Sequence, residues 1–271
     1  KKQLIGIKSL WLNNVFNMKI VYLFNSSVPS HNANSLQVIN VCNELSVNNH
    51  EISLITPNTG FKKTISEHYG IKKSFNLIKL KGFKKFPQGL NYYLYSIFSI
   101  IRAIKINPEI FITRNYFTLF LLILLRKKII FEIHTDLDFE GRINNFIFKN
   151  FNLLDSKSII NLVFITKALK QHFFKTYKLK SKKFTILSSV SNIKTYPQIF
   201  TKKIDLKIGY FGLLNKSRGF DFICKLSRID LMNKYYVYGG TNLFINNEKK
   251  KIKNKNLILS SYQPYKNIKK L

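Results

Sequence analysis

The stretch MKIVYLFNSSVPSHNANSLQVINVCNELSVNNHEISLITP, residues 18–57, decides the fold. It opens with an uninterrupted apolar run at 18–24, which is typical of a strand buried on both faces of a parallel sheet. A polar loop follows, and residues 35–45 then repeat apolar side chains at helical spacing before a second apolar run at 51–56. A strand, a helix and another strand within about 40 residues predict a βαβ unit with a right-handed crossover.

The same alternation of strands and helices continues through the rest of the chain. We expect further strands at 75–80, 109–113, 129–133, 159–165 and 184–187, and helices at 90–106, 116–125, 143–154 and 168–177. The pattern lapses into a polar linker at 192–203. It then restarts with strands at 206–211, 235–238 and 256–259, a helix at 220–229 and a helix that opens at Ile268.

These elements predict an α/β protein with two Rossmann-like domains, each built on a parallel, doubly wound sheet. We expect an N-terminal domain at 18–195. We also expect a C-terminal domain at 196–271 that is incomplete, because the alternation stops after about three strands. Residues 1–17 precede the first strand and do not begin with Met, so we expect an N-terminal extension that lies outside the core.

The chain is strongly basic, with 45 Lys and Arg against 13 Asp and Glu and a net charge of +32. Its 45% hydrophobic content excludes a disordered polybasic tail. The basic excess runs through the whole chain, which fits either a compositional bias towards A- and T-rich codons or attraction to an anionic membrane surface. There is no RNA-binding aromatic signature and no zinc-finger spacing, so nucleic acid is not an expected partner.

The cysteines and the apolar runs of the sequence indicate the cellular compartment in which we expect the protein. Cys42 and Cys224 are the two cysteines, and they form neither a disulfide framework nor a zinc-binding cluster. The most apolar run, 117–125, is far shorter than the ~20 residues of a membrane-spanning helix. The first residues lack a secretory pattern. We therefore expect a cytoplasmic, metal-free protein that contacts the inner face of the membrane peripherally.

Ligands of such sheets bind at the carboxyl ends of the strands. The loops at those ends contain no GxGxxG, no phosphate-binding GxxxxGK[ST] and no GxSxG, which argues against a dinucleotide dehydrogenase, a P-loop enzyme and a serine hydrolase. They offer polar amides and hydroxyls, His134 directly after a buried strand, and a turn at 212–219 that combines glycines with basic residues. These residue types suit a site for a sugar and a diphosphate.

The opening stretch 18–57 resembles the start of glycosyltransferase family 4, whose members are retaining nucleotide-sugar enzymes with the GT-B fold. Seven further segments are similar to family landmarks in the same order: PEIFITRN (108–115), IIFEIHTDLD (129–138), LVFITKALKQHF (162–173), FTILSSVS (184–191), IGYFGLLNKSRGFD (208–221), YYVYGG (235–240) and NLILSSYQPYKNIKKL (256–271). The resemblance covers 18–271 and implies a GT-B-like fold.

The resemblance implies transfer of a sugar from a nucleotide-sugar donor to a glycan or lipid-linked acceptor, with retention of configuration and without a cofactor or metal. It implies that His134 is the catalytic residue, close to the donor sugar. It further implies that the donor phosphates meet Gly212, Lys216, Arg218, Gly219 and Gly240, and that the acceptor side contains Asn34, Ser35, Arg114 and Thr166.

Several of these residues also have a purely structural interpretation. His134 and Arg114 can simply follow the ends of strands. Asn34 or Ser35 can cap the helix expected at 35–45, and the Gly239–Gly240 pair can form a tight turn.

The phosphate loop departs from the family pattern. Leu213 stands where the family places an arginine, and Arg218 stands where it places a lysine. The acidic motif that holds the donor in the family would lie beyond residue 271. We therefore expect that this chain neither binds a nucleotide-sugar tightly nor turns it over. An alternative function is that of an inactive or fragmentary GT-B-like protein that binds a sugar, a membrane or a partner.

Overall fold

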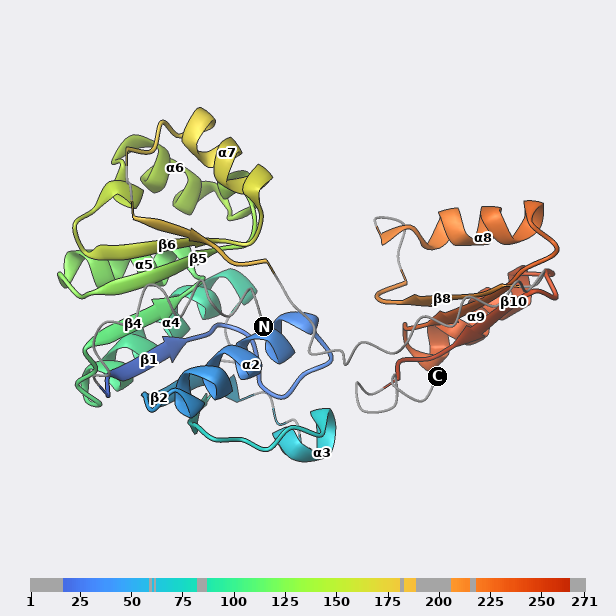
Figure 1. Ribbon diagram of the computed structural model, residues 1–271, viewed down its shortest axis with the longest axis horizontal. Helices are drawn as coiled ribbons and strands as arrows, with labels where there is room; N and C mark the ends of the chain where they lie inside the picture. The colour runs from blue at the N-terminus through green and yellow to red at the C-terminus, as the bar shows by residue number, and fades with distance from the viewer. Residues whose placement is uncertain are drawn as a thin grey trace. The chain divides into compact units, whose positions relative to one another are not determined.

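The structure, a computed structural model, describes residues 17–58, 60, 62–81, 87–180, 183–188, 206–214 and 218–263. The chain divides into two compact units (Figure 1). The first unit contains Lys1–Glu67 and Ile71–Ser191, and the second contains His68–Gly70 and Asn192–Leu271. Most of the N-terminal extension, the linker expected at 192–203 and the helix expected from Ile268 lie outside the described residues.

The described part of the first unit is built on a seven-stranded parallel sheet with the order β3-β2-β1-β4-β5-β6-β7. The strands are β1 (Lys19–Leu23), β2 (Glu51–Asn58), β3 (Asn76–Lys81), β4 (Ile110–Thr113), β5 (Ile129–Ile133), β6 (Ile159–Phe164) and β7 (Phe184–Ile186). Strand β1 lies between β2 and β4, so the strand order reverses beside it. The carboxyl ends of β1, β4 and β5 therefore flank the crevice where ligands of such sheets bind.

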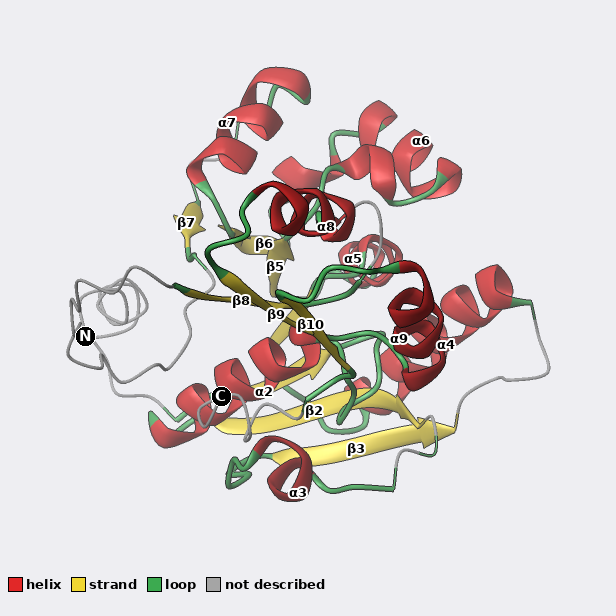
Figure 2. Ribbon diagram, turned by 90° about the vertical axis from the view of Figure 1, so that its right-hand side faces the viewer, coloured by secondary structure: helices red, strands yellow, loops and turns green. Residues whose placement is uncertain are grey.

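Helices connect these strands and cover both faces of the sheet. They are α2 (Ala33–Val47), α3 (Ile65–Tyr69), α4 (Gln88–Ile104), α5 (Tyr116–Leu124), α6 (Arg142–Asn150) and α7 (Lys167–Thr176), with short 3₁₀ turns at Leu137–Phe139 and Leu153–Asp155. Helix α2 covers one face near β1, whereas α4 and α5 cover the other (Figures 1 and 2). Right-handed crossovers require this division, because the chain adds strands first on one side of β1 and then on the other.

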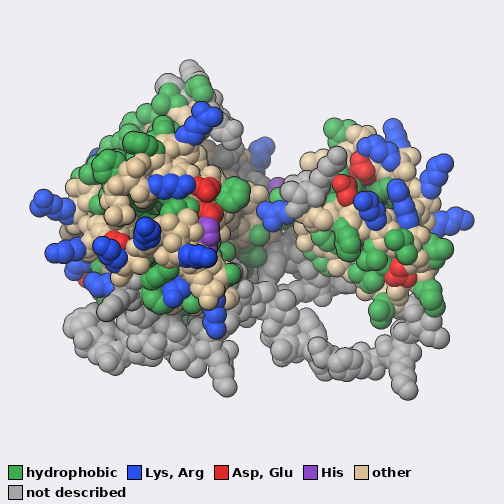
Figure 3. Space-filling view, turned by 90° about the horizontal axis from the view of Figure 1, so that it is seen from above, with side chains coloured by type: hydrophobic (Ala, Val, Ile, Leu, Met, Phe, Trp, Pro, Cys, Tyr) green, Lys and Arg blue, Asp and Glu red, His purple; other side chains and the backbone are tan. Residues whose placement is uncertain are grey.

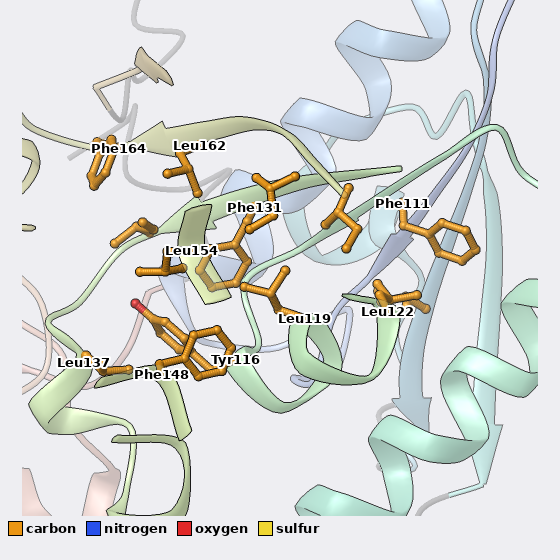
Figure 4. Close-up of a cluster of buried hydrophobic side chains, with 14 of the residues drawn as sticks. Phe111, Tyr116, Leu119, Leu122, Phe131, Leu137, Phe148, Leu154, Leu162 and Phe164 are labelled. Carbon is orange, nitrogen blue, oxygen red and sulfur yellow. The ribbon is translucent and has the colours of Figure 1, made fainter. Parts of the chain in front are cut away.

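The largest core of the first unit lies between the sheet and α4 to α7 (Figure 4). The Tyr116 ring packs edge-on against Phe131, with centroids 4.9 Å apart, and against Phe148, with centroids 5.1 Å apart. Each such aromatic pair contributes about 0.5–1.5 kcal/mol beyond burial of its area. Tyr116 and Phe131 are at most 1% exposed, so this packing fixes the start of α5 and the middle of β5 beneath the crevice.

The second unit contains a three-stranded parallel sheet in its described part, with the order β10-β9-β8. Its elements are β8 (Lys207–Phe211), α8 (Phe220–Ile229), β9 (Lys234–Tyr238), α9 (Asn242–Lys251) and β10 (Leu257–Ser260). Tyr235 and Val237 alternate inward along β9 and pack with Phe220 of α8 and Ile245 of α9. These are two consecutive βαβ units, of which the sequence predicted the first and the final strand of the second.

The expected strands all appear, with ends that differ by at most two residues, and the prediction of two Rossmann-like parallel sheets is confirmed. The helix expected at 143–154 is wrong at its end, because α6 stops at Asn150. Asn152 is left-handed, with φ 46°, and therefore breaks the helix before the following 3₁₀ turn. The sequence analysis also missed α9, whose ten residues carry few apolar side chains. Thr241 begins α9 by accepting a hydrogen bond from Phe244 N at 3.2 Å.

Candidate functional site

A charged side chain interrupts the otherwise apolar and fully buried strand β5. Four of its five residues are Ile or Phe, and the fourth position is Glu132. Strand β4 ends at Thr113 and β5 at Ile133, so Arg114 and His134 directly follow two neighbouring strands. Because the strands are parallel, both residues lie at the same edge of the sheet as the Glu132 carboxylate.

One carboxylate oxygen holds these residues together. Arg114 Nε donates a hydrogen bond to Glu132 Oε2 at 2.8 Å, and His134 Nε2 lies 3.1 Å from the same oxygen. The side chains of Arg114 and Glu132 are each 10% exposed, and that of His134 is 22% exposed. The cluster is therefore a largely buried ion pair with a histidine at its solvent side.

Opposing effects act on the Glu132 carboxyl. Burial alone would raise its pKa, because a desolvated carboxylate is costly. The positive charge of Arg114 and the hydrogen bond to His134 outweigh burial and hold the pKa of Glu132 below its usual value. The carboxyl is therefore ionised at neutral pH and pairs with the Arg114 guanidinium.

The Arg114 side chain is fixed on several sides. Its Cζ lies 5.8 Å from the ring centroids of both Tyr22 and Phe24, and Nη1 is 3.4 Å from Gln37 Oε1 on α2. Among the described residues, the buried Nη2 atom has no hydrogen-bond partner. An unpaired buried donor on a charged group is costly in a folded protein. Besides Glu132, the buried Tyr22 hydroxyl is a polar group that acts on the guanidinium.

A cavity of about 170 Å³ opens beside this cluster, at the carboxyl ends of β1, β4 and β5. Its lining combines amide, hydroxyl, imidazole, guanidinium and carboxylate groups: Phe24, Asn25, Asn34, Arg114, Asn115, Tyr116, His134, Thr135 and Glu140. Thr135 Oγ1 donates to Glu140 Oε1 at 2.7 Å. Burial raises the pKa of Glu140, although this hydrogen bond partly opposes the effect. Such a polar lining, with donors and acceptors on several sides, suits a ligand that carries many hydroxyl groups.

The start of α2 differs from the expectation that Asn34 or Ser35 caps it. The N-cap is Asn32, and both predicted residues lie inside the first turn. Ser35 is fully buried, and its Oγ lies 2.6 Å from Ser30 Oγ and donates to Ser27 O at 2.9 Å. It therefore holds the preceding loop in place, whereas Asn34 lines the cavity.

Thr166 is placed as a helix cap. It precedes α7, and its Oγ1 accepts a hydrogen bond from Leu169 N at 3.0 Å. It follows β6, one strand beyond β5 in the sheet, and is not among the residues that line the cavity. The fold thus brings Asn34, Arg114 and His134 together at the cavity. Ser35 instead holds the loop before α2, and Thr166 caps α7.

Glycines of the second unit bring two loops into direct backbone contact. Gly212 N donates to Tyr238 O at 3.1 Å, and Gly239 N donates to Ser260 O at 3.0 Å. A Cβ on Gly239 would lie 1.8 Å from the carbonyl oxygen of Gly212, so no other residue fits there. Gly240, with φ 70°, continues the turn. The loops after β8 and β9 therefore lie against each other at the carboxyl edge of the second sheet.

The cation Arg218 is exposed beside the N-terminus of α8, where Gly219 is the N-cap with φ 80°. Tyr210 Oη donates to Arg218 O at 2.7 Å and to Leu213 O at 3.2 Å, which ties the two ends of the loop together. The Leu213 side chain is 60% exposed. Lys216 lies outside the described residues. The helix N-terminus and Arg218 together give this loop a positive potential.

Two further searches covered the described part of the chain. No cluster of three or more His, Cys, Asp or Glu side chains in it is arranged to hold a metal ion. Likewise, none of its helices combines the length and apolar character needed to cross a membrane.

No protein-family model and no curated protein matches the sequence, but solved structures resemble the fold. HepE from Anabaena, solved with UDP and glucose, has a TM-score of 0.62 and 13% identity, over 91% of this chain and 70% of its own. The lipopolysaccharide outer core galactosyltransferase WaaB has a TM-score of 0.59 and 15% identity, and the match covers 93% of this chain and 71% of WaaB. A UDP-GlcNAc 2-epimerase from Neisseria meningitidis, solved with UDP-GlcNAc, has a TM-score of 0.55 and 11% identity, over 92% and 73%.

At these identities the likeness shows the fold, and the GT-B-like fold expected from the sequence is confirmed. The similar structures include glycosyltransferases and an epimerase, so the fold alone does not select one reaction. The side chains of the candidate site have to decide between sugar transfer and epimerisation.

Sequence reasoning missed Glu132, Asn25 and Glu140 as parts of the site. For Glu132 a signal was present, because a lone carboxylate in the strand sequence IIFEI must find a partner if both faces of the strand are buried. Asn25 and Glu140 lie in loops at the carboxyl edge, where the sequence does not reveal which side chains turn inward.

Proposed function

We propose that this protein is a glycosyltransferase that moves a sugar from a nucleotide-sugar donor to a glycan or lipid-linked acceptor with retention of configuration. The observation that carries the proposal is the cluster of Arg114, Glu132 and His134 beside a polar cavity at the switch point of the first sheet. HepE and WaaB, which have similar folds, support it. The proposed reaction needs no metal or cofactor, and the proposed location is cytoplasmic, at the inner face of the membrane.

In this proposal the first unit binds the acceptor and contributes His134. Glu132 engages Nε2 of His134, so Nδ1 is the ring nitrogen that remains for a sugar hydroxyl. Arg114 lines the same cavity and directs its positive charge towards the oxygens of the bound sugar. Both groups are held by the same carboxylate, so the site is ordered before the ligand arrives.

The second unit binds the donor diphosphate at the loop after β8. Gly212, Gly219 and Gly240 keep the backbone close to the phosphates, and Arg218, together with Lys216, supplies positive charge as the diphosphate leaves. Arginine can bind phosphate oxygens in a fork, so Arg218 is a suitable replacement for a lysine.

One specific observation favours the alternative, a non-catalytic module that binds a sugar, a membrane or a partner. Leu213 is exposed at a position of the phosphate loop where the resembling family has a cation, so one charged hydrogen bond to the diphosphate is missing. A hydrogen bond to a charged group contributes about 1.5–3 kcal/mol. The alternative therefore predicts weak donor binding without turnover.

Release of free nucleoside diphosphate tests the proposal. The chain is incubated with UDP-glucose, UDP-galactose or GDP-mannose and a glycolipid extract, and UDP or GDP is measured. The proposed transfer predicts release by the unaltered chain and by His31→Ala, whose residue is exposed in the same unit, but not by His134→Ala. Sugar epimerised at C2 without transfer would indicate an epimerase. If neither the unaltered chain nor any variant converts the donor, the result would favour the alternative, a non-catalytic binding module.

A further inference from the structure

Helix α4 buries Tyr95, Ile100 and three small side chains on one face, and it leaves five large apolar side chains exposed on the other face. Ser96, Ser99 and Ala103 on the inward face are fully buried. The outward face carries side chains that are 39–47% exposed: Leu90, Ile97, Phe98, Ile101 and Ile104. A surface helix of a globular protein normally carries polar and charged residues on its outward face. Single exposed apolar residues need no explanation, but a stripe along a whole helix does.

Hydrogen bonds fix this orientation of α4. Tyr95 Oη donates to Phe24 O at 2.9 Å and to Ile55 O at 3.2 Å, which anchors the helix on β1 and β2. Ser99 Oγ donates to Ser96 O at 2.8 Å within the buried face. A rotation of α4 that buried the leucine and isoleucines would break the tyrosine bonds. The hydrogen bonds of Tyr95 therefore keep the apolar stripe on the outward face of α4.

Helix α5 extends the apolar surface. The rings of Tyr93 on α4 and Phe117 on α5 pack edge to face, with centroids 4.6 Å apart, so the helices lie side by side. Leu124 and Leu125 at the end of α5 are 63% and 46% exposed. Both helices lead into strands of one parallel sheet, so they run in the same direction and end at the same edge.

Basic residues gather where these two helices end. Residues 88–107 and 116–128 contain no Asp or Glu. They contain five cations, which lie in the last turn of α4 or directly after the two helices: Arg102, Lys105, Arg126, Lys127 and Lys128. In Figure 3, Lys and Arg side chains lie over the surface of the described residues among patches of apolar side chains. The C-terminal end of the apolar stripe thus carries five cations, and the first acidic residue after α4 in the sequence is Glu109.

We propose that the exposed side chains of α4, α5 and their C-terminal turns, the α4–α5 surface, dock on an anionic lipid bilayer. An apolar helix face enters the boundary between headgroups and acyl chains, and flanking lysines and arginines bind anionic headgroups. A second copy of this chain fits less well, because a symmetric contact would bring ten cations into one interface and residues 88–107 and 116–128 offer no acidic partner for them. The inference does not depend on the proposed sugar transfer.

Vesicle flotation of the full chain tests the apolar part of the surface. Wild-type protein should float with vesicles of phosphatidylcholine and phosphatidylglycerol, but not with phosphatidylcholine alone. Phe98→Ser with Ile101→Ser should weaken binding about tenfold or more, since two apolar side chains leave the membrane. The matched control is Phe222→Ser with Ile229→Ser on α8, whose residues are 65% and 82% exposed. The control should bind like wild type, and circular dichroism confirms that each variant is folded.

A second pair of variants tests the charges. Lys127→Glu with Lys128→Glu should weaken binding by about fivefold or more for each charge removed. Lys249→Glu with Lys250→Glu on α9 changes the net charge equally and should have a much smaller effect. Equal losses in the two pairs would overturn the proposal, because charge alone would then explain binding. Equal flotation with both vesicle types would also overturn it, as would a dimer by light scattering that Phe98→Ser with Ile101→Ser abolishes.

Discussion

Glu132→Gln should destabilise the first unit strongly although it barely changes the shape of the side chain. Glutamine keeps an oxygen that can accept from Arg114 Nε and His134 Nε2, but the guanidinium, 10% exposed, loses its counter-charge. Removal of one partner from a buried ion pair costs about 3–5 kcal/mol. Since 1 kcal/mol shifts the melting temperature by about 2–4 °C in a domain of this size, we expect a fall of roughly 6–20 °C.

The pH dependence of this effect has a definite sign. Burial would raise the pKa of Glu132, but Arg114 and the hydrogen bond to His134 outweigh burial and lower it. The stability that Glu132 contributes is therefore complete above its unfolded-state pKa of about 4.3 and is lost as the pH falls through the lower folded-state value. The difference between wild type and Glu132→Gln should be constant near neutral pH and should shrink in acid.

Thermal and urea unfolding, followed by circular dichroism across this pH range, measure both effects. Glu51→Gln is the control, because the 58% exposed Glu51 pairs with Lys19 at 3.3 Å and such surface pairs contribute about 1 kcal/mol or less. Replacement of both Glu132 and Arg114 by methionine should recover much of the loss, since no buried charge remains unpaired. A melting temperature of Glu132→Gln equal to that of wild type, or a difference that grows in acid, would refute the reasoning.

Three further predictions concern the rest of the chain. Gly239→Ala should unfold the second unit at lower urea concentration, because its Cβ would meet Gly212 O at 1.8 Å; Gly89→Ala, with open space around it, should be neutral or stabilising. Leu213→Arg should tighten UDP binding about tenfold or more in isothermal titration, since it adds a charged donor to the phosphate loop; unchanged affinity would place the diphosphate elsewhere. Deletion of residues 1–17 should leave the melting temperature nearly unchanged, and a fall of many degrees would show that the extension packs on the core.

The strands could be predicted from the sequence because burial on both faces of a parallel sheet leaves continuous apolar runs. Strand β1 and strand β5 are examples, and their bounds differ little from the expectation. Helix α9 could not be found in this way, since most of its residues are polar and only Ile245 is buried. Thr241 is a common N-cap residue, but such a residue alone is a weak indication of a helix. It gains weight here because α9 has to connect the parallel strands β9 and β10.

The chemistry of the site was predictable in kind but not in detail. Because ligands of parallel sheets bind at the carboxyl ends of the strands, the sequence points to Arg114 and His134, and the structure brings these two candidates together. That one oxygen of Glu132 contacts both residues depends on the pairing of β4 with β5 and on the side-chain conformations, which the sequence pattern does not specify. The orientation of α4 was not predictable either, because apolar residues occur on both faces of the helix and the structure buries the face that contains Tyr95, Ser99 and Ile100.

The central place of β1 also sets an order of events during synthesis of the chain. Lys19–Leu23 is made first, but one of its two neighbours, Ile110–Thr113, follows about 90 residues later. At ~5–20 residues per second, the ribosome needs roughly 5–18 s to supply it. For that time β1 can pair with β2 alone, and its other edge stays open to any passing strand. A nascent chain of this protein therefore needs protection on that edge until β4 emerges.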